Sequence, residues 1–428
     1  MGDGVKLLPH QQKIMELTAG FDNVADYVDM GGGKTFIGSE QMKRFGCRIN
    51  LVICQKSKVQ DWIDHFSSHY QYSVWDLTKR GGLDAWCLFD GGLKKKPCVL
   101  IINYELAFRR PKLLQIEHFT LLLDESSMIQ NERAKRSKFV LQLHPDHVIL
   151  LSGTPTAGKY ERLWSQCKLL GWRISKSTYY SQYVIQKFID FDGSGFKRPV
   201  VTGYKNVDRL KRKLKEHGAV FMKSEEFGAN LPETNEITVK VKAPAGYKKF
   251  LKSRVIWMEG RQLVGDTTLT TRMYARQICG QYNAAKLEAA RDLIESTDDR
   301  IVIFYNFNDE LNKLLNIVEQ LNKPAAVVNG EKKDLDPFIK HDDCVALIQY
   351  QAGAMGLNLQ AANKVIYFTL PDRSELFEQS KARIHRIGQH RPCFYYYLLC
   401  PGTVEMKVLE TLRMRKDYTD ALFEKDIL

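Results

Sequence analysis

The chain has 428 residues, of which 44% are hydrophobic and 26% are charged. This balance is typical of a globular protein of two or three domains, and it excludes a mainly disordered chain. The formal net charge of +13 favours a polyanionic partner such as a nucleic acid, although solubility alone would also account for it.

The spacing of the cysteines and the length of the apolar runs indicate in which cellular compartment the protein is found. None of the nine cysteines forms a CxxC pair, so neither a zinc site nor a disulfide framework is indicated, and a reduced cytosol fits best. The longest apolar runs are far too short to cross a bilayer, and the N-terminus lacks the apolar segment of a secretion signal. We therefore expect a cytoplasmic protein without a membrane partner.

Short apolar runs bounded by turn residues recur in two blocks of the chain. Those of the first half are Leu51–Cys54, Cys98–Ile102, Phe119–Leu123 and Val148–Leu151. Those of the last third are Ile301–Phe304, Ala325–Val328, Val345–Ile348, Val365–Phe368 and Phe394–Leu398. Continuous apolar strands that alternate with stretches of helical length predict parallel sheets covered on both faces. The predicted fold class is therefore α/β, with one lobe at 1–170 and a second at 285–428.

The intervening segment, 171–284, lacks this alternation and is expected to be a mainly helical protrusion and linker. Its one clearly amphipathic stretch runs from Val207 to Lys215, with Val207, Leu210 and Leu214 on one face. Basic residues occupy the other faces of this helix. They suit either a solvated surface or a protrusion that faces DNA.

A phosphate-binding loop is predicted at Asp29–Thr35, which reads Asp-Met-Gly-Gly-Gly-Lys-Thr. Its glycines let backbone N–H groups turn toward phosphate oxygens, and a helix that follows adds positive potential at its N-terminus. Lys34 is expected to reach the β- and γ-phosphates of ATP, and the Thr35 hydroxyl to ligate Mg²⁺. The full motif has a glycine where this chain has Val28, so a glycine-rich turn with a chance lysine is the alternative. The expected backbone cradle consists of Gly31, Gly32 and Gly33.

Two carboxylates follow the apolar run Phe119–Leu123 directly. Phosphoryl transfer needs one acid to hold the metal and another group to orient the attacking water. Asp124 suits the metal, and Glu125 suits the water. Acids after a strand are also common helix N-caps, but a phosphate-binding loop upstream in the same lobe favours the catalytic interpretation.

The third signal is the stretch from Gln379 to Gln389, which contains Arg383 and Arg386. Their i,i+3 spacing predicts a helix that presents both guanidinium groups on one face. Guanidinium groups aimed at a γ-phosphate stabilise its transition-state charge, an effect worth roughly 10³–10⁵ in rate. Without the other two signals, these arginines would be interpreted as ordinary surface residues.

Together these stretches resemble, in order, the Swi/Snf-related branch of helicase superfamily two. Arg383–Gln389 is the most specific match and resembles its sixth motif, while Asp29–Thr35 resembles its first. The other matching stretches are Leu8–Gln11, Leu51–Ser57 with Trp62 and Phe66, Asp124–Ser127 with Asn131, Leu151–Pro155 with Leu163-Trp164, Ile303-Phe304 and Gln351–Leu359; Leu231-Pro232 and Lys286-Leu287 match family dipeptides. The resemblance covers nearly the whole chain and implies two RecA-like lobes with ATP between them. It also implies nucleotide contacts from Gln11 and Gln379.

The chain departs from the family pattern at a few positions. Ser126 and Ser127 replace the usual Ala-His, and the missing histidine puts the coupling of the second motif to its neighbours in doubt. Ala354 replaces a usual glycine in the fifth motif, and the arginine-rich element before Leu231-Pro232 is thinned to Phe221-Met-Lys223.

The resemblance also nominates residues that touch the DNA backbone. By position they are Lys56, Ser57, Gln351 and Ala352, with Asn329 and Gly330 as weaker candidates. Hydroxyl, ammonium and backbone N–H groups suit phosphates and carry no sequence information, but each position could equally be an ordinary loop residue. The run Tyr395–Tyr397 is interpreted as a buried strand rather than a base-stacking platform.

We therefore expect a monomeric ATP hydrolase that uses ATP and Mg²⁺ to translocate on double-stranded DNA. A strand-separating helicase is the alternative enzyme, and an ATP-dead DNA-binding scaffold is the alternative outside enzymes. No nuclease or chromatin-reading module is recognisable at either end. This suggests a bacterial or phage motor, or one that acts with a separate nuclease or a remodelled protein as its partner.

Overall fold

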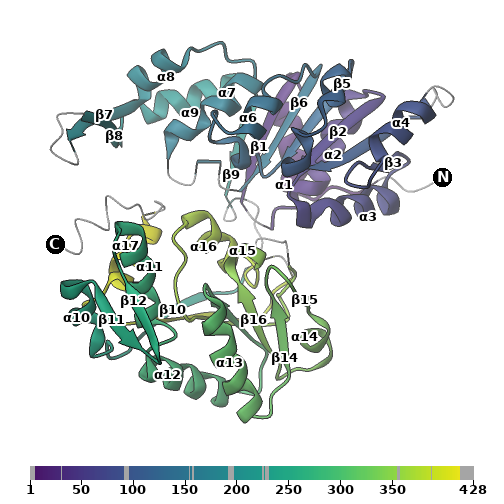
Figure 1. Cartoon of the computed structure of the whole chain (residues 1–428). Coiled ribbons are helices and arrows are strands. Elements are labelled where there is room, and N and C mark those ends of the chain that lie inside the picture. Colours follow the sequence, from purple (N-terminus) through teal and green to yellow (C-terminus); the bar gives the residue numbers. More distant parts are fainter. Residues whose placement is uncertain are drawn as a thin grey trace. The chain divides into compact units, whose positions relative to one another are not determined.

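The computed structural model describes residues 5–29, 31–90, 96–153, 155–156, 159–190, 197–223, 226, 231–353, 357–386 and 388–414. The chain divides into two compact units, Met1–Ala229 and Asn230–Leu428, called lobe one and lobe two below. Each lobe is built around one seven-stranded sheet with helices packed against it (Figure 1). The predicted α/β class with two parallel-sheet lobes is thereby confirmed.

The sheet of lobe one is parallel throughout, in the order β3-β4-β2-β5-β6-β1-β9. Its strands are β1 (Asn23–Val28), β2 (Ile49–Cys54), β3 (Ser73–Asp76), β4 (Cys98–Asn103), β5 (Phe119–Asp124), β6 (His147–Ser152) and β9 (Ala219–Met222). Leu51 and Ile53 pack in one apolar cluster, whereas Val52 and Cys54 pack in another on the opposite face. Burial on both faces explains why these strands appear in the sequence as continuous apolar runs.

Helices connect the strands of lobe one and cover the sheet (Figure 1). They are α1 (Pro9–Thr18), α2 (Lys34–Phe45), α3 (Val59–His69), α4 (Gly82–Asp90), α5 (Tyr104–Ala107), α6 (Lys135–Val140), α7 (Trp164–Leu169), α8 (Lys176–Tyr183) and α9 (Val207–Glu216), with the 3₁₀ turns η1 (Lys56–Lys58), η2 (Pro111–Gln115), η3 (Ser126–Ile129) and η4 (Tyr160–Leu163). The predicted amphipathic helix is present as α9, and its Leu210 and Leu214 are buried.

The sheet of lobe two has the order β10-β18-β17-β13-β16-β14-β15. All neighbours are parallel except the edge pair β14 and β15. Its strands are β10 (Thr234–Lys240), β13 (Ile301–Tyr305), β14 (Ala325–Val328), β15 (Lys333–Asp334), β16 (Val345–Gln349), β17 (Lys364–Tyr367) and β18 (Cys393–Leu399). Tyr395 and Tyr397 on β18 are buried, so the interpretation of the tyrosine run as a core strand is confirmed.

The helices of lobe two are α10 (Gly246–Ser253), α11 (Thr268–Cys279), α12 (Ala284–Glu295), α13 (Asn308–Gln320), α14 (Asp336–Lys340), α15 (Tyr350–Gly353), α16 (Ser374–Lys381) and α17 (Val404–Arg413). In the part of the chain that the structure describes, no helix has the length and apolarity needed to span a membrane.

The segment 171–284 differs from the expectation of a mainly helical insertion, because six strands lie beside its helices. β7 (Val184–Asp190) and β8 (Lys197–Tyr204) form one hairpin, and β11 (Val255–Met258) and β12 (Arg261–Val264) form another. β9 completes an edge of the first sheet, and β10 an edge of the second. The strands β7, β8, β10 and β12 lack the continuous apolar runs of strands buried on both faces, so the pattern that revealed the central strands missed them. β9 and β11 are apolar runs of four residues that the alternation of strands and helices did not single out.

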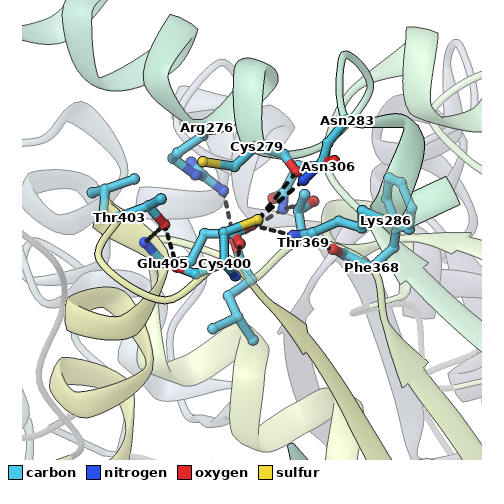
Figure 2. A network of polar contacts seen from close by, with 12 residues as sticks. Arg276, Cys279, Asn283, Lys286, Asn306, Phe368, Thr369, Cys400, Thr403 and Glu405 are labelled. Atoms are coloured by element: carbon cyan, nitrogen blue, oxygen red, sulfur yellow. Dashed lines mark hydrogen bonds and ion pairs between the residues drawn. The ribbon is translucent and has the colours of Figure 1, made fainter. Parts of the chain in front are cut away.

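A buried polar network ties the helices of lobe two to its sheet (Figure 2). Lys286 of α12 donates to Glu405 of α17 and to the Phe368 carbonyl after β17. Cys279, Cys400 and Glu405 lie close enough to one another to hold a metal ion. However, the Lys286 ammonium already binds Glu405, and burial holds the pKa of the Cys279 thiol well above its usual range. In this structure the group is a buried ion pair that joins α12 to α17.

Candidate nucleotide site

The predicted phosphate-binding loop joins β1 to α2 in lobe one. Gly31 and Gly33 have φ angles of 89° and 71°, a left-handed backbone that favours glycine. Gly33 is the N-cap of α2, so the helix begins at Lys34 and directs its positive end toward the loop. The Lys34 ammonium donates to the carbonyls of Val28 and Asp29 at 2.9 and 3.3 Å, which folds its side chain back along the loop. Val28, which stands where the full motif has a glycine, is the last residue of β1 and is buried.

Helix α1 packs its polar side chains against this loop. The Gln11 amide accepts from the Leu8 backbone N–H at 2.8 Å and donates to the carbonyls of Gly32 and Gly33 at 3.4 Å. The His10 ring nitrogen Nε2 lies 2.9 Å from the Gly32 oxygen. A Cβ atom at Gly33 would lie 2.3 Å from Gln11 Nε2, so a side chain there would displace the Gln11 amide. The sequence analysis identified Gln11 but not His10, which nothing in the sequence marks except its position next to Gln11.

A cavity of about 950 Å³ lies along α2, on the side of the helix that faces the end of α3. Phe36 and Glu40 line it from α2, and His69 and Tyr70 line it from the end of α3. Lys6, which precedes α1, lines it as well. The cavity therefore begins within one helical turn of Lys34 and is large enough for a small organic molecule.

The two predicted acids lie at the carboxyl end of β5. The indole N–H of Trp62 donates to Asp124 Oδ2 at 2.9 Å, and the Tyr104 hydroxyl donates to the Asp124 backbone carbonyl at 3.0 Å. Glu125 has a φ angle of 54°, which costs a non-glycine residue about 1–3 kcal/mol and is a frequent feature of functional sites. Glu125 occupies the N-cap position of η3, but its side chain makes no capping bond to that turn. Sequence reasoning gave Trp62 only as a motif landmark and missed its contact with Asp124.

The arginines of lobe two lie in a turn, and the prediction that a helix presents them is wrong. α16 ends at Lys381, before Arg383 and Arg386. The turn that follows is fixed from the other side by Gln389, whose amide donates to the carbonyls of Gln360 and Ala362 at 3.0 and 2.8 Å. These two hydrogen bonds fix the turn after α16. Burial lowers the pKa of the Arg386 guanidinium, which nevertheless remains charged at neutral pH.

Other contacts fix the same turn within lobe two. His385 Nε2 lies 2.9 Å from the Pro232 carbonyl oxygen, and the Tyr395 hydroxyl donates to the Lys381 carbonyl at 2.9 Å. Gln379 on α16 is buried, and within the described ranges its Oε1 has no hydrogen-bond partner.

The candidate DNA contacts of lobe one lie at the end of β2. Lys56 and Ser57 form the 3₁₀ turn η1, directly before α3, and Lys56 is exposed. Trp62, which contacts Asp124, lies one helical turn into α3, the helix that directly follows η1.

The candidate DNA contacts of lobe two differ among themselves. Gln351 is exposed on α15, whereas the Ala352 side chain is buried and only its backbone could reach a ligand. Asn329 Oδ1 accepts from the backbone N–H groups of Glu331 and Lys332, so this oxygen closes the turn that contains Gly330. The substitution at Ala354 lies outside the described residues.

Comparison with known proteins adds two family matches. A family model described as SNF2-related domain matches residues 11–284, and one described as Helicase conserved C-terminal domain matches residues 285–388. A solved structure of the Sulfolobus solfataricus SWI2/SNF2 ATPase core in complex with dsDNA is 23% identical, with a TM-score of 0.44, and the match covers 98% of this chain and 92% of that one.

The curated relatives come from bacteria and eukaryotes. The "Putative ATP-dependent helicase/translocase YwqA" of Bacillus subtilis is 24% identical over 77% of this chain and 38% of its own length. The "Uncharacterized ATP-dependent helicase YqhH" of the same organism is 23% identical over 95% of this chain and 77% of its own length. The mouse protein named as member 1 of the SWI/SNF-related matrix-associated actin-dependent regulator of chromatin subfamily A is 22% identical over 86% of this chain and 38% of its own length. The chain therefore spans well under half the length of some relatives and about three quarters of another.

Proposed function

Because the chain belongs to the SNF2-related family of helicase-like ATPases, we propose that it is a DNA-dependent ATPase that translocates on double-stranded DNA. One observation carries this proposal above the others. A glycine-rich loop with Lys34 at a helix N-terminus and the pair Asp124-Glu125 both lie at the carboxyl ends of parallel strands in one sheet. That edge is where open α/β sheets bind their ligands.

The residues of lobe one fit ATP with a magnesium ion. The left-handed glycines and the start of α2 supply N–H groups for phosphates, and Lys34 can exchange its backbone carbonyls for phosphate oxygens. The cavity along α2 gives room for the base and ribose beside Phe36, within reach of the segment before Gln11. The Thr35 hydroxyl and Asp124 are the oxygen ligands that would hold Mg²⁺, which supplies charge neutralisation to the β- and γ-phosphates.

Within this proposal each acid has its own task. Trp62 fixes one oxygen of Asp124 and leaves the other to the metal side. Glu125 orients the attacking water and accepts its proton. Its strained backbone is consistent with a side chain that the fold directs to a required position.

We assign the ATP-binding lobe to 1–170, the protrusion and linker to 171–284 and the C-terminal lobe to 285–428. Arg383 and Arg386 of the C-terminal lobe stabilise the charge that develops on the γ-phosphate, and Gln379 lies on α16, the helix directly before their turn. Their turn is fixed by Gln389 and His385, so the guanidinium groups need little further ordering when they meet the phosphate.

The DNA part of the proposal rests on charge and on chemistry. The net charge of +13 suits a polyanion, and Lys56, Ser57, Gln351 and the backbone at Ala352 offer donors for phosphate oxygens. The B. subtilis relative is named a helicase/translocase, which is consistent with movement along nucleic acid.

ATP turnover should be measured without nucleic acid and with duplex DNA, single-stranded DNA or RNA. Duplex DNA should stimulate turnover most, and the affinity should fall steeply with salt because counterions are released on binding. The protein should displace the third strand of a triplex and leave a forked duplex intact. Unwinding of the fork would favour the strand-separating helicase instead. Absence of turnover under every condition would favour a DNA-binding scaffold.

A further inference from the structure

The side chain of Gln166 on α7 is the centre of a hydrogen-bond network in lobe one. Its amide oxygen accepts from the Tyr27 hydroxyl at 2.9 Å and from the Ser126 hydroxyl at 2.8 Å. Its amide nitrogen donates to the Pro155 carbonyl at 3.1 Å. The exposed fractions of Gln166 and Ser126 are 0%, and that of Tyr27 is 4%, so water does not compete for these bonds.

The three partners belong to three parts of the candidate nucleotide site. Tyr27 lies on β1, two residues before Asp29, where the phosphate-binding loop begins. Ser126 directly follows Asp124 and Glu125 at the end of β5. Pro155 lies in the segment that leaves β6. Because β5, β6 and β1 are neighbours in the sheet, one amide joins the segments at the carboxyl ends of three adjacent strands.

The bonds of Gln166 depend on one another. The Pro155 carbonyl can only accept, so it fixes which end of the amide is the nitrogen, and the amide oxygen then accepts from both hydroxyls. An apolar side chain at 166 would leave two buried hydroxyls without this acceptor, a cost that a local adjustment of one partner cannot remove. A shift of Ser126 therefore moves the preferred position of the amide, and through it Tyr27 and Pro155.

We propose that Gln166 is a positioning residue that couples the acidic pair to the strand before the phosphate-binding loop and to the segment after β6. The inference rests on the proposed ATPase function and deepens it. Gln166 itself does not touch the nucleotide; it acts through the three segments that it joins. The family usually has alanine at position 126, and alanine could not donate this hydrogen bond. Ser126 therefore gives this chain a bond between the acidic pair and Gln166 that the usual Ala-His pair lacks.

The first test replaces Gln166 by leucine, which keeps the approximate volume and removes the amide. Gln166→Leu should lower kcat by about 10- to 100-fold, as misplaced catalytic groups do, and should leave KM for ATP nearly unchanged. The factor by which duplex DNA stimulates turnover should also be smaller in this variant than in wild type. Ser165→Ala is the matched control, because Ser165 is the preceding residue of α7 and is buried, and within the described residues its hydroxyl has no hydrogen-bond partner. That variant should keep the kcat of the wild type.

The second test separates the branches of the network. Tyr27→Phe and Ser126→Ala each remove one donor to the same oxygen, so the loss in the double variant should differ from the product of the single losses. A third variant, Gln166→Glu, keeps an acceptor for both hydroxyls, but its carboxylate cannot donate to the Pro155 carbonyl. Only the protonated carboxylic acid can donate this bond, so the kcat of this variant relative to wild type should rise as the pH falls. A merely structural defect has no reason to show this pH profile.

A measurement that does not depend on ATP hydrolysis tests the role of Gln166 independently of the proposed ATPase activity. In hydrogen–deuterium exchange, ATP should protect the segment after β6 in wild type and in Ser165→Ala, but not in Gln166→Leu. A wild-type protein that binds ATP without turnover would refute the ATPase proposal, and exchange would still test the coupling. If Gln166→Leu does not fold, the single and double variants of Tyr27 and Ser126 carry the test. Wild-type kcat and wild-type protection in Gln166→Leu, or strictly multiplicative losses at Tyr27 and Ser126, would overturn the inference.

Discussion

The two lobes have similar sheets but hold their candidate catalytic groups in different ways. In lobe one the phosphate-binding loop and the acidic pair are held by side chains from several helices, among them Gln11, Trp62 and Gln166. In lobe two the arginines lie in one turn that Gln389 and His385 fasten mainly through backbone carbonyls. Lobe one is thus organised around side-chain contacts between separate motifs, and lobe two around the shape of a single turn.

This difference indicates a division of labour. A site made of several linked segments can respond as a unit when a nucleotide occupies it, because movement of one segment changes its neighbours. A rigid turn is suited to deliver a guanidinium group without cost of ordering at the moment of reaction. We therefore expect substitutions in the phosphate-binding loop of lobe one to change both nucleotide binding and turnover, and substitutions in the lobe-two turn to change turnover alone.

The largest effect is expected at the phosphate-binding loop. Lys34→Ala should reduce ATP turnover to background and weaken ATP binding, because the charge that neutralises the β- and γ-phosphates is lost. Turnover and the affinity for a fluorescent ATP analogue would be measured side by side. Lys138→Ala is a suitable control, since Lys138 is an exposed lysine of lobe one, on α6, and does not line the cavity along α2. Turnover within a few-fold of wild type in Lys34→Ala would refute the assignment of the loop.

The two acids should separate binding from chemistry within lobe one. Glu125→Gln should lower turnover by about 10²–10⁴-fold and still bind ATP with Mg²⁺, because an amide cannot accept the proton of the water. Asp124→Ala should instead weaken the Mg²⁺-dependent part of ATP binding. A magnesium titration of nucleotide affinity checks both variants. Equal affinities in the two variants would show that their roles are not divided as proposed.

Two buried carboxyl groups, one in each lobe, differ in their partners, because within the described residues only that of lobe two has a basic side chain as its ion-pair partner. Burial raises the pKa of Asp26 on β1 from 3.8 to about 7, against the opposing influence of Arg44 and Gln41, whereas Glu405 in lobe two is paired with Lys286. Between pH 3.8 and about 7 the folded state holds the proton of Asp26 and the unfolded state does not, so stability falls as the pH rises through this window.

The Asp26→Asn variant should therefore be more stable than wild type at pH 8, by roughly 1–3 kcal/mol at most. The difference should shrink toward pH 5. Thermal unfolding across this pH range measures it. An equal effect of the substitution at both pH values would mean that Asp26 does not titrate in the folded protein as its burial implies.

The smallest effect is expected at the DNA surface of lobe one. Lys56→Ala should weaken binding to duplex DNA a few-fold, independently of sequence, and reduce the salt slope of the affinity by about one. Lys58→Ala is the matched control on the same 3₁₀ turn, because Lys58 is paired with Asp61 at 2.8 Å. If both variants bind DNA with the affinity and salt slope of the wild type, the turn does not contact the phosphates.

The sequence predicted the central strands well, because parallel strands buried on both faces leave long apolar runs such as Cys98–Ile102. It did not predict the hairpin β7-β8, whose exposed strands bury little apolar surface and show no such run. The i,i+3 spacing of Arg383 and Arg386 suggested a helix because spacing carries no information on where a helix ends. The helix ends at Lys381, and the sequence pattern does not reveal the contacts of Gln389 with Gln360 and Ala362 that fix the turn after it.

Within the candidate site, the residues with a motif signature were found and their supporting partners were not. Lys34 and Asp124 stand in recognisable patterns, whereas Trp62 and Gln166 act through hydrogen bonds to residues far away in sequence. Such contacts depend on the register of the sheet, which spacing along the chain does not specify. A polar residue at a helix position with apolar neighbours, as at Gln166 on α7, is the only hint that the sequence offers.

We propose that an arginine of lobe two completes the ATP site that lobe one builds. This role of the arginine is tested most directly by measuring ATP affinity and DNA-stimulated turnover in Arg386→Ala. Arg373→Ala serves as control, because Arg373 is exposed next to α16 and pairs with Glu375. We predict wild-type affinity for ATP, turnover lower by about 10³-fold or more, no stimulation by duplex DNA, and little rescue by Arg386→Lys. An Arg386→Ala variant that kept DNA-stimulated turnover would contradict a site shared between the lobes.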